Sequence, residues 1–168
     1  MGTITSIHRY PVKSMGGETL SSVDLTQGGL PGDRCWAVRD EVRGGIRGAK
    51  KIPALMTCHA RFAETPAATG SSAAEITLPG GELVSTGDAD AGKRISDAVA
   101  HEVSLWPLLP ADAREHYLRG APDHEDMEKE FRAMFARLPD EPLPDIGKFP
   151  PELLEFESPP GTLSLIHI

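Results

Sequence analysis

The sequence is poor in cysteine and in aromatic residues. It has 2 cysteines among 168 residues, and aromatic residues make up 5%. Cys35 and Cys58 form no CxxC pair and no other spacing typical of metal ligands. Both lie in apolar-rich stretches, so we expect two ordinary buried thiols and no metal site.

An excess of positive charge and a long apolar run are also missing. The chain has 17 Lys and Arg against 25 Asp and Glu, a net charge of −8. Broad binding to nucleic acid or to an anionic membrane needs a basic face and is therefore excluded. No run of about 18 apolar residues could span a membrane, and the first residues lack the apolar run of a signal peptide. We expect a cytoplasmic protein. A local anion site built from two or three cations remains compatible with the negative net charge.

Several motifs of catalysis and metal binding are absent as well. The sequence contains no GxSxG, P-loop or GxGxxG pattern. The histidines show no HxxxH or HxH spacing; they are His8, His59, His101, His116, His124 and His167, of which the last lies in the final six residues. The sequence alone therefore predicts no catalytic residue and no metal ligand.

Proline and glycine, in contrast, are abundant, with 15 and 17 residues. Frequent breakers suit short strands joined by turns, so we expect a mainly β, α+β fold. Alternating or β-branched segments predict strands, and the segments are 3–12, 18–25, 35–41, 55–62, 74–78, 82–86 and 101–108. Pro79-Gly80-Gly81 predicts a hairpin between two of them, and residues 44–53 are interpreted as a mobile loop.

Two helices are expected, one short and one longer and amphipathic. The first extends from a cap at Asp88 to about Ala100, with Ile95 and Val99 on its apolar face. The second covers 123–138, where acidic residues fill the first turn. Its apolar stripe is interpreted as core packing, and its members are Met127, Phe131, Met134, Phe135 and Leu138.

The remainder of the chain is dominated by proline. Seven prolines between Pro139 and Thr162 predict an irregular segment, either a surface strap or a connector to a further domain. The last six residues, 163–168, read LSLIHI. They are an in-frame translation of CTGTCTCTTATACACATC, the start of a transposase adapter used in sequencing libraries. We expect the natural sequence to be represented only to about Thr162.

Two short motifs carry charged residues at strand ends. They are Tyr10-Pro11-Val12-Lys13-Ser14 and Gly32-Asp33-Arg34. Local chemistry alone favours a surface lysine and a structural Asp33–Arg34 ion pair. The alternative is an anion site, in which Lys13, Ser14 and Arg34 surround phosphate oxygens, provided that the two strand ends meet.

The order and spacing of these motifs resemble those of a known family. The segment ITSIHRYPVKSMGGETLSSVDLTQGGLPGDRCWAVRDE is similar to the opening of the MOSC amino-terminal β-barrel domain. The similarity continues through GAKKIPALMTCHARF, the ITLPGGE hairpin and HEVSLWPL, over about residues 3–107. The tract LPDIGKFPPELLEFESPPGT resembles the lead-in to the MOSC core of bacterial members.

This resemblance implies a domain organisation and a function. Residues 1–110 would be the small β-barrel domain, and 111–162 a helix and a proline-rich lead-in to a missing MOSC core. Relatives such as the amidoxime-reducing component bind the molybdenum cofactor, a molybdopterin, and the positions matching Lys13, Ser14 and Arg34 hold its phosphate. Their metal ligand is a cysteine of the core, which matches neither Cys35 nor Cys58.

The implied parent protein is an oxidoreductase that reduces N-hydroxylated compounds and receives electrons from a flavoprotein, haem or iron–sulfur partner. This chain alone would be inactive. One alternative is a cofactor carrier or a sulfurase-linked binding module, which an adjoining pyridoxal-phosphate domain would favour. Another is a stand-alone interaction domain that docks through its proline tract, which a monomeric, cooperatively folding product would favour.

A long read of the source DNA through the codon for Thr162 tests the expected boundary. We expect the frame to continue into a MOSC core that contains a cysteine. A stop codon directly after Ile168 in native DNA would contradict the adapter interpretation and would favour the interaction domain.

Overall fold

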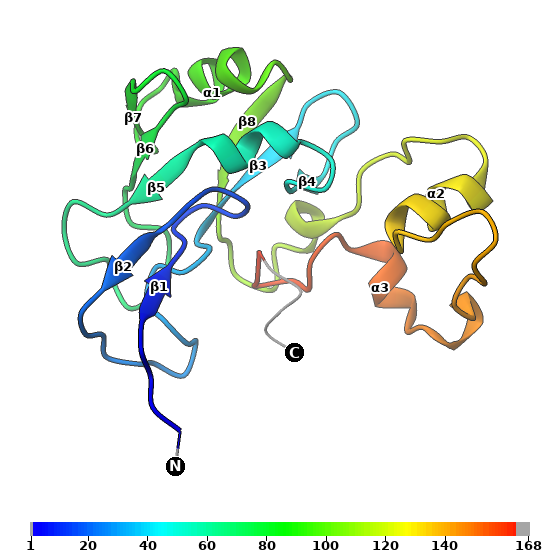
Figure 1. Cartoon of the computed structure of the whole chain (residues 1–168), viewed down its shortest axis with the longest axis horizontal. Coiled ribbons are helices and arrows are strands. Elements are labelled where there is room, and N and C mark those ends of the chain that lie inside the picture. Colours follow the sequence, from blue (N-terminus) through cyan, green and yellow to red (C-terminus); the bar gives the residue numbers. More distant parts are fainter. Residues whose placement is uncertain (1, 164–168) are drawn as a thin grey trace.

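The protein consists of short strands in three small sheets, with helical segments beside them (Figure 1). The structure is a computed structural model and describes residues 2–163. The strands are β1 (Ile7–Arg9), β2 (Glu18–Leu20), β3 (Trp36–Asp40), β4 (Ile46–Arg47), β5 (His59–Arg61), β6 (Glu75–Thr77), β7 (Leu83–Ser85) and β8 (Val103–Pro107). The α-helices are α1 (Ala91–Val99), α2 (Met127–Met134) and α3 (Pro151–Glu155). Short 3₁₀ segments are η1 (Pro53–Thr57), η2 (Arg114–Tyr117) and η3 (Ile146–Lys148).

All strands within the sheets pair in antiparallel fashion. The sheets have the orders β1-β2, β4-β3-β8 and β5-β6-β7. The predicted hairpin is confirmed as β6–β7, and Gly81 takes a φ of 84° in its turn, a conformation that glycine adopts readily. The expected mainly β, α+β fold class is confirmed, although the three sheets do not close into a barrel.

The segment after β1 joins the other two sheets. Val12 forms a parallel bridge with Trp36 of β3, and Gly16 forms one with His59 of β5. Gly16 also donates its N–H to Cys58 at 2.8 Å and accepts the N–H of Ala60 at 2.8 Å. Residues 12–16 therefore lie between the two three-stranded sheets and pair with both.

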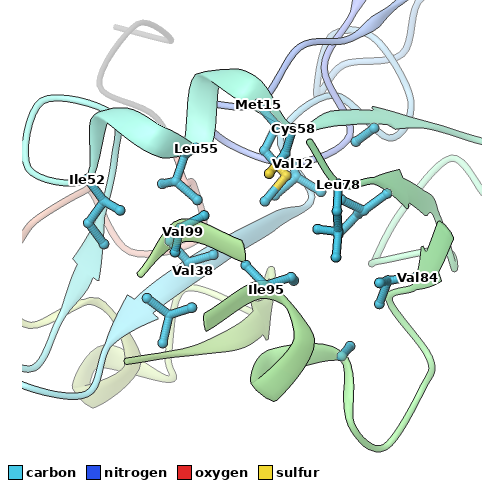
Figure 2. Packing of buried hydrophobic residues seen from close by; sticks show 14 residues of the cluster. Val12, Met15, Val38, Ile52, Leu55, Cys58, Leu78, Val84, Ile95 and Val99 are labelled. Carbon is cyan, nitrogen blue, oxygen red and sulfur yellow. The ribbon is translucent and has the colours of Figure 1, made fainter. Parts of the chain in front are cut away.

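The main hydrophobic core lies between these sheets and α1, and Figure 2 shows 14 of its residues. Ile95 and Val99 of α1 are buried there, as expected from their spacing. The predicted cap is wrong: α1 begins after Asp90, and the Asp88 carboxylate instead accepts the N–H of Ser85 at 2.9 Å. Asp88 belongs to the turn that follows β7.

Residues 44–53, interpreted as a mobile loop, contain a short buried strand. Ile46 and Arg47 form β4, pair with Val38 and Arg39, and are both buried. Ile46 belongs to a second core cluster, whose members are Ala37, Ile46, Tyr117, Phe156 and Leu163. Apolar packing and strand pairing thus overcome the breakers around β4.

The two predicted helices are of nearly equal length, because α1 has 9 residues and α2 has 8. The helix expected over 123–138 is shortened at both ends. The Asp126 carboxylate accepts the N–H groups of Glu128 and Lys129 and caps α2. Ala136 takes a φ of 51°, beyond the end of α2 at Met134.

The proline-rich segment contains more regular structure than predicted. Pro151 begins α3, where the absent N–H and the fixed φ of proline are tolerated. The chain then returns to the body of the protein, since Phe156 bridges Leu118 and is buried. Leu163 is buried in the second core cluster, and residues 164–168 of the expected adapter lie outside the described residues.

Ile95→Ala tests the main core. The side chain is fully buried, so we expect a loss of about 2–5 kcal/mol in the free energy of unfolding. Urea denaturation followed by circular dichroism measures this loss. Ile4→Ala is the control, because Ile4 is 81% exposed and its truncation should change stability by less than about 0.5 kcal/mol.

Candidate functional site

The two charged motifs lie side by side. Arg34 donates its N–H to the Tyr10 carbonyl at 2.7 Å, and Trp36 donates to the Pro11 carbonyl at 3.1 Å. Lys13 donates its N–H to the Trp36 carbonyl at 2.8 Å. The strand ends therefore meet, which is the condition that the predicted anion site requires.

Asp33 holds the two motifs together. Its Oδ1 accepts the N–H of Tyr10 at 2.8 Å, and its Oδ2 accepts from Nη1 of Arg34 at 2.7 Å. The Arg34 guanidinium also lies 5.6 Å from the centre of the Tyr10 ring. The structural Asp33–Arg34 pair is thus present, and it places a cation next to Lys13.

Two members of the predicted site have left-handed backbone conformations. Ser14 has a φ of 68° and Arg34 a φ of 48°. Such conformations cost about 1–3 kcal/mol for residues with a Cβ and are frequent at ligand sites. Gly48 approaches Ser14 closely, since a Cβ on Gly48 would lie 2.7 Å from Ser14 Oγ. A larger residue at position 48 would therefore displace the Ser14 hydroxyl.

The Lys13 ammonium is in an unfavourable environment. Burial lowers its pKa from the ordinary 10.5; Glu157 opposes this effect, while the nearby charges of Arg34 and Arg119 lower the pKa further. Glu157 itself pairs with Arg119 at 2.8 Å. A half-buried cation next to further cations attracts an anionic ligand.

Lys13 and Ser14 line a cavity of about 730 Å³, and Arg34 is not among its lining residues. One side of the cavity consists of Lys13, Ser14 and the segment Arg47–Lys51. The other side belongs to residues 119–157, which we call the α2–α3 arm. In Figure 1 this arm lies to one side of the three sheets.

The apolar stripe of α2 faces this cavity. Met127, Phe131, Met134 and Phe135 line it, whereas Leu138 is 62% exposed. None of them belongs to the core clusters of the described residues. The interpretation of this stripe as core packing is therefore wrong.

Ion pairs attach the arm to the segment of β4. Lys51 contacts the carboxylates of Asp123 and Glu130, and Arg47 lies 4.0 Å from Asp123. Glu130, buried although it is charged, also accepts the N–H groups of Asp123 and His124 at 3.0 and 3.1 Å. Burial alone would raise the pKa of Asp123, but the hydrogen bond and charge of Lys51 and the charges of the neighbouring arginines lower it.

These cavity residues were missed by sequence reasoning. Lys51 belongs to the segment interpreted as a loop, and its partner Asp123 is 72 residues away in the chain. The sequence places the acidic residues of 123–126 at the start of a helix. Asp126 does cap α2, but Asp123 pairs with Lys51 instead. Residues 47–51 read RGAKK, and their three basic residues give no local signal for this pairing.

Both thiols are buried away from this cavity. Burial raises the pKa of Cys35 to about 11 and also raises that of Cys58, so both are protonated at neutral pH. Figure 2 shows Cys58 next to Met15 in the main core.

Within residues 2–163, no group of three or more His, Cys, Asp or Glu side chains is arranged to hold a metal ion. None of the helices in that part of the chain has the length and apolar character needed to cross a membrane.

Lys13→Met tests the electrostatic state of Lys13. A lowered pKa means that the folded chain holds this proton less tightly than the unfolded chain, so the charge destabilises the fold below the lowered pKa. We expect Lys13→Met to raise the free energy of unfolding at pH 7, and the gain to shrink as the pH rises toward 10.5. Urea denaturation at several pH values measures it.

The control is Lys148→Met, at a side chain that is 82% exposed, for which we expect no pH-dependent gain. A gain for Lys13→Met that is the same at every pH would contradict a charge effect.

Comparison with known families gives one match. The MOSC N-terminal beta barrel domain matches residues 1–107, which include both charged motifs. Comparisons with curated proteins and with solved structures give no match. Because the match covers more than half of the chain, this protein belongs to the MOSC N-terminal beta barrel domain family.

Proposed function

We propose that this chain is the amino-terminal part of a molybdenum-cofactor-binding MOSC oxidoreductase, in which Lys13, Ser14 and Arg34 hold the phosphate of the cofactor. The family is generally associated with this cofactor. The observation that carries the proposal is the half-buried Lys13 ammonium at the cavity wall. In the part of the chain that the structure describes, no carboxylate forms an ion pair with it at 4.0 Å or less.

The residues present fit a phosphate group. Lys13 supplies a cation, and Ser14 a hydroxyl beside a glycine that leaves space. Arg34 adds a second positive charge close enough to lower the pKa of Lys13. A bound phosphate would relieve this repulsion, because its negative charge would lie near both cations.

Arg34 has a different role from Lys13 in this proposal. Its side chain is fixed by Asp33 and does not line the cavity, so it acts on the anion through its charge. Asp33 also aligns the motifs through the N–H of Tyr10. Glu157 is partly neutralised by Arg119, and the site keeps a positive balance.

The cofactor supplies the redox-active metal when it is bound. The protonated, buried thiols of Cys35 and Cys58 are not suited to ligate it. We therefore expect the metal ligand in a MOSC core that follows this domain in the parent protein. Reduction of N-hydroxylated compounds would be the activity of that parent, with a cytoplasmic flavoprotein, haem or iron–sulfur protein as electron donor.

The family also supports a second candidate function. MOSC N-terminal domains are linked to sulfurase-like proteins, in which an anion site would serve to bind or carry the cofactor. Lys13, Ser14 and Arg34 would then have the same role, without a redox reaction. A pyridoxal-phosphate domain in the parent gene would favour this function.

The double variant Lys13→Ala and Arg34→Ala in the complete protein tests the anion site. We expect at least a tenfold loss of cofactor retention after gel filtration, because the Lys13 contact of about 1.5–3 kcal/mol and the nearby positive charge of Arg34 are both lost. Metal and pterin content measure this loss, and an unchanged circular dichroism spectrum shows that the fold is kept. Normal cofactor content would contradict the assigned roles.

Gly48→Ala provides a test that changes space and leaves charge unaltered. Its Cβ would lie 2.7 Å from Ser14 Oγ, so the hydroxyl has to move and retention should fall. Gly80→Ala is the matched control, since a Cβ there meets nothing within 4 Å. Equal retention by the two variants would rule out a role for Ser14.

A further inference from the structure

The cavity has an aromatic side that the anion site does not use. Met127, Phe131 and Met134 of α2 line it together with Phe135, which directly follows α2, and Phe149, which follows η3. We call these five residues the aromatic wall. In the described part of the chain they belong to none of the core clusters.

The rings of the aromatic wall are already arranged for stacking. The centroids of Phe135 and Phe149 lie 5.7 Å apart and their planes differ by 22°. Flat rings prefer such offset arrangements, and methionine sulfur makes favourable contacts with ring edges. The wall therefore favours a flat ring over a flexible aliphatic chain.

Charged groups around the wall already have protein partners. Lys51 pairs with Asp123 and Glu130, and Arg119 pairs with Glu157. Lys50 donates to the carbonyl of Met134, and Arg47 donates to that of Ala121 at 2.8 Å. A charged ligand would have to break one of these pairs or compete for Lys13, whereas an uncharged ligand would not.

We propose that this cavity binds an uncharged aromatic small molecule against the aromatic wall, beside the anion site. The volume of about 730 Å³ suits a small organic ligand. The inference rests on the proposed function in one respect: in that function the Lys13 ammonium binds a phosphate, so Lys13 does not pair with the aromatic ligand. In the parent protein this molecule would be the substrate or its ring, held next to the cofactor.

Equilibrium dialysis of the full chain with 2-naphthol tests the aromatic wall. We expect Phe131→Ser and Phe149→Ser to weaken binding about three- to tenfold, because each removes a ring contact. Phe149→Tyr keeps the ring and should keep the affinity. The control is Leu138→Ser, an exposed position that does not line the cavity.

Two serine variants are used so that one remains informative if the other fails to fold. Phe131 lies in α2, whereas Phe149 lies outside this helix. Far-UV circular dichroism identifies any variant that fails to fold, and the other variant then decides. Unchanged affinity in the folded serine variants, or an equal loss in Leu138→Ser, would overturn the inference.

Lys13→Gln separates this inference from the proposed function. We expect this variant to bind 2-naphthol like the unmodified chain, to bind inorganic phosphate at least fivefold more weakly, and to bind 2-naphthoate more weakly than 2-naphthol. Unchanged phosphate binding would contradict the anion site alone. Loss of 2-naphthol binding, or tighter binding of 2-naphthoate, would contradict the uncharged aromatic ligand.

Discussion

The pairing of residues 12–16 with both three-stranded sheets is the interaction on which the rest of the structure depends. Val12 bridges Trp36 and Gly16 bridges His59, so one short segment joins β3 to β5. Lys13 and Ser14 lie between these two bridges. Their backbone is therefore fixed by the same hydrogen bonds that hold the sheets together. The left-handed conformation of Ser14 persists because its neighbours on both sides are paired.

Strand and hairpin positions were predictable, because alternation and turn residues are local signals. β3, β8 and the β6–β7 hairpin lie where the sequence places them, and Ile95 and Val99 are buried as their spacing implies. Strand lengths were less predictable: residues 3–12 contain a strand of only 3 residues, since pairing partners set where a strand ends.

The candidate site was only partly predictable. Resemblance to a family pointed to Lys13, Ser14 and Arg34, and the hydrogen bonds between the motifs explain why they are neighbours. The apolar stripe of α2 was visible in the sequence, but periodicity shows that a helix has an apolar face and not what that face contacts. The partnership of Lys51 with Asp123 joins distant segments and leaves no local pattern.

The two sides of the cavity are held in place by different kinds of contact. One is anchored by backbone hydrogen bonds and core packing, whereas α2 buries Glu130 and is attached mainly through ion pairs and hydrogen bonds. Ion pairs tolerate small changes in distance better than a close-packed core does. In the proposed complex, backbone hydrogen bonds would fix the residues that hold the anion, and the ion-paired side would adjust to the rest of the ligand. Under this proposal, rings of different width would be accommodated without moving the residues that position the charge.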